Sequence, residues 1–138
     1  MKVLCIADLI SSKNSPQSII DWANNSELEI TVGKTYTVFA ISKYFDVLFY
    51  YIISDESSEY PLAYPHYLFE VYDENISIFW DTSYLKTKSI DTLEIKNGEI
   101  ISFKEWTVKG ERFYENLLEG NSEELRIFKK YRDDMLRE

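Results

Sequence analysis

The stretch 31–54, "TVGKTYTVFAISKYFDVLFYYIIS", contains two runs that are typical of β-strands. Residues 31–42 and 47–54 are rich in Thr, Val, Ile and aromatic side chains, which are favoured in strands. Because only residues 43–46 separate the two runs, we predict an antiparallel hairpin. The run 47–53 has no polar face, unlike a strand with one solvated side. We therefore expect it to be covered on both faces, or to present Tyr outward.

The segments around this hairpin predict further strands. Residues 2–7 form a short apolar run. The stretch 55–66 reads as a loop, because its two prolines remove backbone donors and exclude a central strand. Residues 67–73 and 77–81 read as strands around a turn at 73–75, or as a short 3₁₀ turn leading into a strand. Within 91–106, Asn97-Gly98 predicts a hairpin with a type I′ turn, which would set Lys96 opposite Glu99.

Helix signals lie near both ends of the chain. Ser15 followed by Pro16 predicts a short helix over 16–24. A second helix is expected over 110–118, with Gly120 in the left-handed position that ends helices. Asn121 then begins a third, in which Glu124 three residues later would complete a variant capping box.

These elements predict one α+β domain over residues 1–138, with a β-rich part at 1–107 and a helical tail at 110–137. The strands are expected to form a small, strongly bent antiparallel sheet, either SH3-like or a partly open barrel. A short N-terminal helix and the C-terminal helical tail complete the expected fold.

Composition narrows the range of partners. The formal net charge is −9, which disfavours non-specific binding to nucleic acid or to an anionic membrane and favours a cationic partner. The start of the chain does not resemble a signal peptide, and no apolar run is long enough to span a bilayer. The single Cys5 excludes an internal disulfide. We therefore expect a cytoplasmic protein that binds neither nucleic acid nor membrane.

The charge and the aromatic residues are concentrated in one window. Residues 44–85 contain no Lys or Arg, eight acidic residues and thirteen of the 22 aromatic residues. One interpretation is that the aromatic side chains form the core and the acids protect sheet edges. The other is a surface that anchors a basic protein, since Tyr is enriched at interface centres. On that second interpretation, the expected partner-binding residues are Asp55, Glu56, Glu59, Tyr60, Tyr64, Asp73 and Glu74.

Catalytic and metal-binding patterns are scarce. His66 is the only histidine, and no nucleophile-elbow sequence accompanies it. The stretch 32–35 lacks the earlier glycine of a phosphate-binding loop, and 54–59 lacks the spacing of an EF-hand. We predict no catalytic residue, metal ligand or cofactor. Two alternatives stay open: an enzyme using paired carboxylates, and an SH3-like module binding a peptide between Tyr60, Pro61, Tyr64 and Trp80.

The order of "TVGKTYTVFAIS", "FYYIISDES" and "YPLAYPHYLFEVYDENISIFW" resembles small bacterial immunity proteins of polymorphic or contact-dependent toxin systems. The shared features are a Val-Gly-Lys strand start, a hairpin ending in acids, a Tyr-Pro pair and a Phe-Glu-Val-x-Asp strand, all within about residues 31–80. The resemblance implies no enzymatic activity, no cofactor, and a cognate toxin domain as the protein partner. Immunity proteins are often acidic because many of their toxins are basic nucleases.

Overall fold

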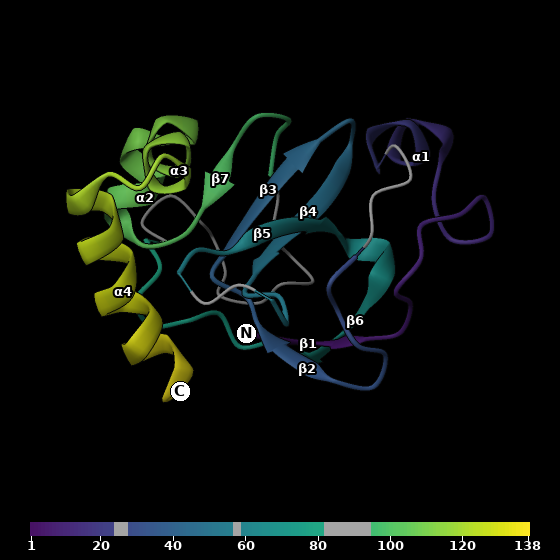
Figure 1. The fold of residues 1–138 in the computed structure, drawn as a ribbon, viewed down its shortest axis with the longest axis horizontal. Helices are drawn as coiled ribbons and strands as arrows, with labels where there is room; N and C mark the ends of the chain where they lie inside the picture. The colour runs from purple at the N-terminus through teal and green to yellow at the C-terminus, as the bar shows by residue number, and fades with distance from the viewer. Residues whose placement is uncertain (24–27, 57–58, 82–94) are drawn as a thin grey trace.

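The computed structural model describes residues 1–23, 28–56, 59–81 and 95–138, and its strands form two antiparallel sheets (Figure 1). The first sheet has the order β2-β1-β6, with β1 at Lys2–Cys5, β2 at Thr35–Thr37 and β6 at Phe69–Asp73. The second has the order β5-β4-β3-β7, with β3 at Ala40–Tyr44, β4 at Val47–Ile52, β5 at Leu62–Pro65 and β7 at Ile100–Ile101. The α+β class is as predicted, but the strands form two sheets, and the described residues form no closed barrel.

The predicted hairpin is confirmed as β3 and β4, which pair from Ala40 beside Tyr51 to Tyr44 beside Val47. The single strand predicted over 31–42 is wrong, because it divides into β2 and β3 in different sheets. Val38 and Phe39 lie between them and are both buried. A buried corner between two strands can have the same strand-forming composition as one continuous strand. The composition of 31–42 therefore did not indicate where β2 ends and β3 begins.

The type I′ turn conformation expected at Asn97-Gly98 is found instead at Phe45 and Asp46. Phe45 and Asp46 both have positive φ, 54° and 58°, which is the arrangement of a type I′ hairpin turn. At Asn97-Gly98 only the glycine has positive φ, so the predicted type I′ turn there is wrong. The side chain of Asn97 instead bonds Asp46, as described below. The Glu99 carboxylate accepts from the backbone N–H of Lys96, at 3.3 Å, so this contact is not the expected side-chain pair.

The proline-rich segment contains a strand that was expected to be loop. β5 pairs with β4, placing Tyr64 beside Tyr50 and Pro65 beside Phe49. It lies at the edge of its sheet, where a missing N–H is tolerated, so the exclusion of a central strand holds. A 3₁₀ turn at His66–Leu68 then leads into β6, as one of the two interpretations proposed. Residues 77–81 form only an isolated bridge, between Trp80 and Phe103.

The four-stranded sheet is covered on both faces, as the run 47–53 predicted. On one face, Tyr50 and Tyr64 contact Phe69 of the other sheet through ring edges, with centroids 6.0 and 6.5 Å apart. On the opposite face, Phe49 packs with the buried Ile19 of α1. Tyr51, further along the same face, contacts Trp106 of α2 at 5.1 Å. Alternate residues of one apolar strand thus enter two separate layers.

The helices of the described residues are α1 (Gln17–Ala23), α2 (Lys104–Lys109), α3 (Glu111–Leu118) and α4 (Ser122–Leu136). Figure 1 shows α1 near one end of the four-stranded sheet and α2 to α4 grouped near the other end. The short early helix and the two tail helices are confirmed. Within the part predicted to be β-rich, α2 begins at Lys104 and buries Trp106 completely, which the sequence did not predict. None of these helices is long and apolar enough to cross a membrane.

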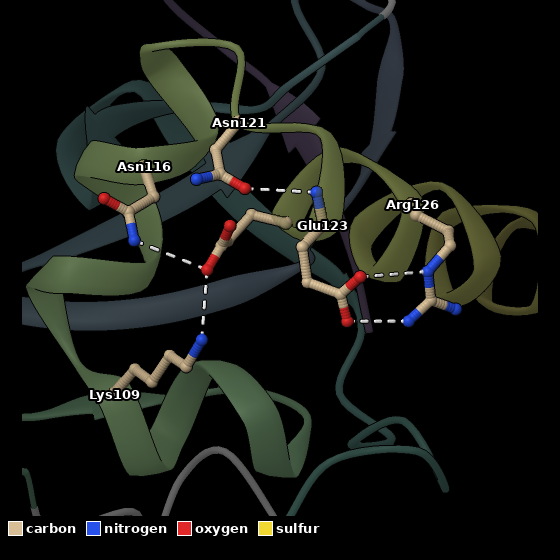
Figure 2. Close-up of polar contacts among 6 residues, drawn as sticks. Lys109, Asn116, Asn121, Glu123 and Arg126 are labelled. Atoms are coloured by element: carbon tan, nitrogen blue, oxygen red, sulfur yellow. Dashed lines mark hydrogen bonds and ion pairs between the residues drawn. The ribbon is translucent and has the colours of Figure 1, made fainter.

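Polar contacts connect the helices α2, α3 and α4 of the C-terminal part (Figure 2). Gly120, with φ 81°, ends α3, and Asn121 caps α4 by accepting from the N–H of Glu123 at 3.1 Å. Glu124 does not complete the expected capping box. Its buried Oε1 instead accepts from Lys109 Nζ of α2 at 3.0 Å and from Asn116 Nδ2 of α3 at 3.3 Å. One carboxylate therefore connects three helices, and Lys109 holds its pKa below the ordinary value.

Replacing this carboxylate should destabilise the fold. We expect Glu124→Ala to lower the free energy of unfolding by about 1–3 kcal/mol, because charge-assisted hydrogen bonds at a buried site are lost. Urea unfolding measures the change. The matched control is Glu123→Ala, the preceding residue, whose exposed pair with Arg126 should matter much less. Equal losses in the two variants would contradict a special role for Glu124.

Candidate functional site

An apolar cleft of about 670 Å³ opens on the face of the four-stranded sheet that carries Phe49 and Tyr51. It lies between α1 and α3, which cover different parts of this face. The lining residues come from segments far apart in the chain: Trp22, Ala23, Leu28, Tyr44, Phe45, Phe49, Tyr51, Leu62, Ala63, Tyr64, Ile100, Glu111, Tyr114 and Glu115.

The strand register explains the floor of the cleft. Side chains directly opposite each other on paired strands share one face of the sheet. Tyr51 therefore lies between Ala40 of β3 and Ala63 of β5, and Phe49 lies beside Ser42. Large aromatic rings next to small side chains leave an uneven surface. A seven-residue helix such as α1 spans only about 10 Å, which is too short to cover this whole face.

Aromatic side chains form the two walls. On the α1 side, Trp22 meets Phe49 through a ring edge, with centroids 5.2 Å apart. On the α3 side, Tyr114 stacks on Trp106 at 5.6 Å and meets Tyr51 edge-on at 5.1 Å. The hydroxyl of Tyr114 donates to the carbonyl of Pro61 at 2.8 Å, and burial raises its pKa, so the phenol stays neutral. Both walls are held by rigid ring contacts.

Two carboxylates, Glu111 and Glu115, are the only charged groups among the described residues that line the cleft. They lie one helical turn apart on α3 and therefore share a face. Glu111 accepts a hydrogen bond from the hydroxyl of Tyr44. Burial, and then this bond, raise the pKa of Tyr44, which keeps its proton on the donor. The cleft thus combines an apolar interior with a negatively charged rim.

Asp55, predicted for partner binding, lies in a network within the protein. Its carboxylate forms an ion pair with Lys34 at 2.6 Å and accepts from Thr31 Oγ1 at 2.6 Å and from Tyr36 at 2.9 Å. Its backbone N–H donates to Glu29 at 2.8 Å. The hydrogen bond from Lys34, followed by that from Thr31, lowers the pKa of the carboxyl. Asp55 therefore ties the end of the β4 segment to the start of β2.

The remaining predicted residues divide into two groups. Glu56 and Glu59 are exposed, Tyr60 is half-buried against the core, and Tyr64 is buried on β5 and lines the cleft. Because Pro61 accepts from Tyr114, the loop that carries Glu59 and Tyr60 runs beside the α3 wall.

Asp73 and Glu74 lie elsewhere. Asp73 pairs with Lys2 in the register of β1 and β6, at the opposite end of β1 from Cys5. The backbone N–H of Cys5 donates to Lys34, the ion-pair partner of Asp55. Asp55 and Asp73 therefore lie near opposite ends of β1, so the predicted acids are spread over different parts of the protein.

Trp80, expected in the alternative peptide groove, is buried against Phe103 and does not line the cleft. The rings of His66 and Tyr67 lie with centroids 4.1 Å apart and planes tilted by 35°, and burial lowers the pKa of His66. Across the described residues, no group of three His, Cys, Asp or Glu side chains could hold a metal ion. Comparison with known protein families, with curated proteins and with solved structures found no match.

Most of the residues that line the cleft were not among the partner-binding residues predicted from the sequence. No binding role was predicted for Trp22, Tyr51, Glu111 or Glu115. The one signal in the sequence was the spacing of Glu111 and Glu115 around Tyr114 on the side of α3 opposite Phe113. Nothing local related that helix face to a helix some ninety residues earlier.

The network around Asp55 predicts a pH-dependent contribution to stability. At neutral pH, Asp55→Asn should lower the free energy of unfolding by about 1 kcal/mol, since a charge-assisted network is weakened. The folded-state pKa lies below the ordinary 3.8, so the contribution is complete above pH 3.8 and is lost as the pH falls through the folded value. Urea unfolding of both proteins should therefore show a difference that narrows on acidification. Glu56→Gln is the matched control, and a difference that persists in acid would contradict this account.

Proposed function

We propose that this protein is an immunity protein: a non-enzymatic inhibitor that binds and neutralises one cognate bacterial toxin in the cytoplasm. The proposed toxin is a basic nuclease, and no cofactor takes part. The chain itself would contact neither nucleic acid nor membrane.

The cleft between α1 and α3 carries this proposal. It is apolar and aromatic inside, and its charged lining residues are Glu111 and Glu115. Aromatic anchors often supply much of the affinity of a protein interface, and charge of one sign around them adds selectivity and faster association. The net charge of −9 supports a basic partner, because it accelerates encounter with a positively charged surface.

The predicted surface contributes at one side of this cleft. Tyr64 lines it, and Glu59 and Tyr60 are carried by the loop next to the α3 wall. The exposed Glu56 and Glu59 would attract a basic partner over longer distances. Asp55 has an internal role in this proposal, and Asp73 and Glu74 lie apart from the contact surface.

An SH3-like peptide-binding module is the second candidate, and the aromatic cleft favours it. In that case the acids would serve solubility, and binding would depend little on salt. Trp80 would have no part, since it lies outside the cleft. A carboxylate-based enzyme has weaker support, because Glu111 and Glu115 are exposed on one helix face and no metal-binding group accompanies them among the described residues.

Co-expression tests the proposed function. We expect the adjacent gene to encode a toxin C-terminal domain, and this protein to restore growth of cells that express it and to co-purify with it. Reversing both rim charges, Glu111→Lys with Glu115→Lys, should weaken the complex about tenfold or more, because attraction becomes repulsion. Isothermal titration at two salt concentrations measures the loss.

The control has the same change of charge at exposed positions outside the cleft, Glu70→Lys with Glu119→Lys. It should retain most of the affinity. Absence of both rescue and a complex would refute the proposed function. A complex that is insensitive to salt and tolerates the Glu111→Lys, Glu115→Lys change would favour the peptide-binding module.

A further inference from the structure

Phe45 has an unfavourable backbone conformation. Its φ of 54° lies in the left-handed region, where a bulky aromatic residue is an outlier and Asn or Gly is favoured. Burial does not offset this strain, because the side chain is 60% exposed. Neither the turn nor the core therefore explains a phenylalanine at this position.

The surrounding contacts hold the strained turn in place. Asp46 and Asn97 exchange two hydrogen bonds: the Asp46 N–H donates to Asn97 Oδ1 at 3.0 Å, and Asn97 Nδ2 donates to Asp46 Oδ1 at 2.8 Å. The N–H of Gly98 also donates to the carbonyl of Lys43 at 2.8 Å. A backbone outlier that is fixed from several sides is a common feature of binding sites. Here the contacts fix Phe45 where it lines the cleft.

A second partly exposed aromatic residue also lines the cleft. Trp22 is 43% exposed, and its ring is held by the edge contact with Phe49. Rigid, partly exposed aromatic side chains beside a hollow are the residues that most often dominate binding energy. The space between the rings is apolar and suits a large hydrophobic side chain.

The charge of the residues that line the cleft indicates which residues should flank the hydrophobic side chain of the ligand. Glu111 and Glu115 have no cationic partner among the described residues, and no Lys or Arg lines the cleft there. A carboxylate at an apolar surface pairs favourably with a Lys or Arg brought by the ligand. An acidic ligand would instead meet like charge.

We propose that the α1–α3 cleft binds a cationic segment carrying a large apolar anchor, and that Phe45 is kept in its strained turn because it grips that anchor. The anchor enters between Phe45 and Trp22, and the flanking Lys or Arg pairs with Glu111 and Glu115. The identity of the partner rests on the proposed function, whereas the chemistry of the cleft does not.

The first test uses two short peptides, Ac-Lys-Trp-Lys-NH₂ and Ac-Glu-Trp-Glu-NH₂. Titration followed by NMR should show the lysine peptide shifting the Trp22 indole resonance and binding about fivefold more tightly than the glutamate peptide. In the Glu111→Gln, Glu115→Gln variant this preference should disappear. No binding by the lysine peptide, or equal binding by both, would overturn the proposal.

The second test separates binding from folding. Phe45→Asn should weaken the lysine peptide about tenfold, while the urea midpoint stays the same or rises, because Asn suits the left-handed conformation. Ile78→Asn, which replaces another exposed apolar residue outside the cleft, should leave peptide binding unchanged. A lower midpoint for Phe45→Asn, or unchanged peptide binding, would overturn the role given to Phe45.

The two proposals can fail separately. A toxin complex that tolerates Phe45→Asn would refute this inference and leave the proposed function standing. Peptide binding as described, without rescue from the toxin, would refute the proposed function and support the chemistry assigned to the cleft.

Discussion

The rest of the structure depends on one constraint, that β4 is apolar on both of its faces and must be covered twice. Its residues Tyr50 and Ile52 are covered by the three-stranded sheet, and Phe49 and Tyr51 by helices from the two ends of the chain. Two features of the chain cover both faces of this short strand. The chain passes from one sheet to the other at Val38 and Phe39, and helices from both ends of the chain pack against the four-stranded sheet. The cleft exists because α1 and α3 cover their face incompletely.

Aromatic side chains pack differently on the two faces of the four-stranded sheet. Toward the three-stranded sheet, rings meet edge-on around Phe69 and fill the core. Toward the helices, the rings are larger than their neighbours on the sheet and are held by a few stacked and edge contacts. The first arrangement excludes water, and the second leaves a rigid hollow. This difference relates the stability of the protein to its proposed binding role.

The acidic residues also divide by surroundings. Glu124 and Asp55 each form an ion pair with a lysine of the same chain and thereby connect separate segments. Glu111 and Glu115 have no cationic partner in the described part of the chain and lie beside an apolar cleft. Charge without an internal partner is available to an external one. The concentration of acids in residues 44–85 therefore does not by itself separate carboxylates that have a partner within the chain from those that have none among the described residues.

The sequence by itself determined the local elements: the β3–β4 hairpin, the helices α1, α3 and α4, and the cap at Asn121. Each depends on residues within a few positions of one another, so propensity and capping were sufficient. Only the tertiary structure decided the division of 31–42, the edge strand β5 and the helix α2, because burial against distant residues overrode local preference. It alone brought Trp22 and Glu111 to the lining of one cleft, since they lie some ninety residues apart in the chain, and short-range pattern carries no information over such a separation.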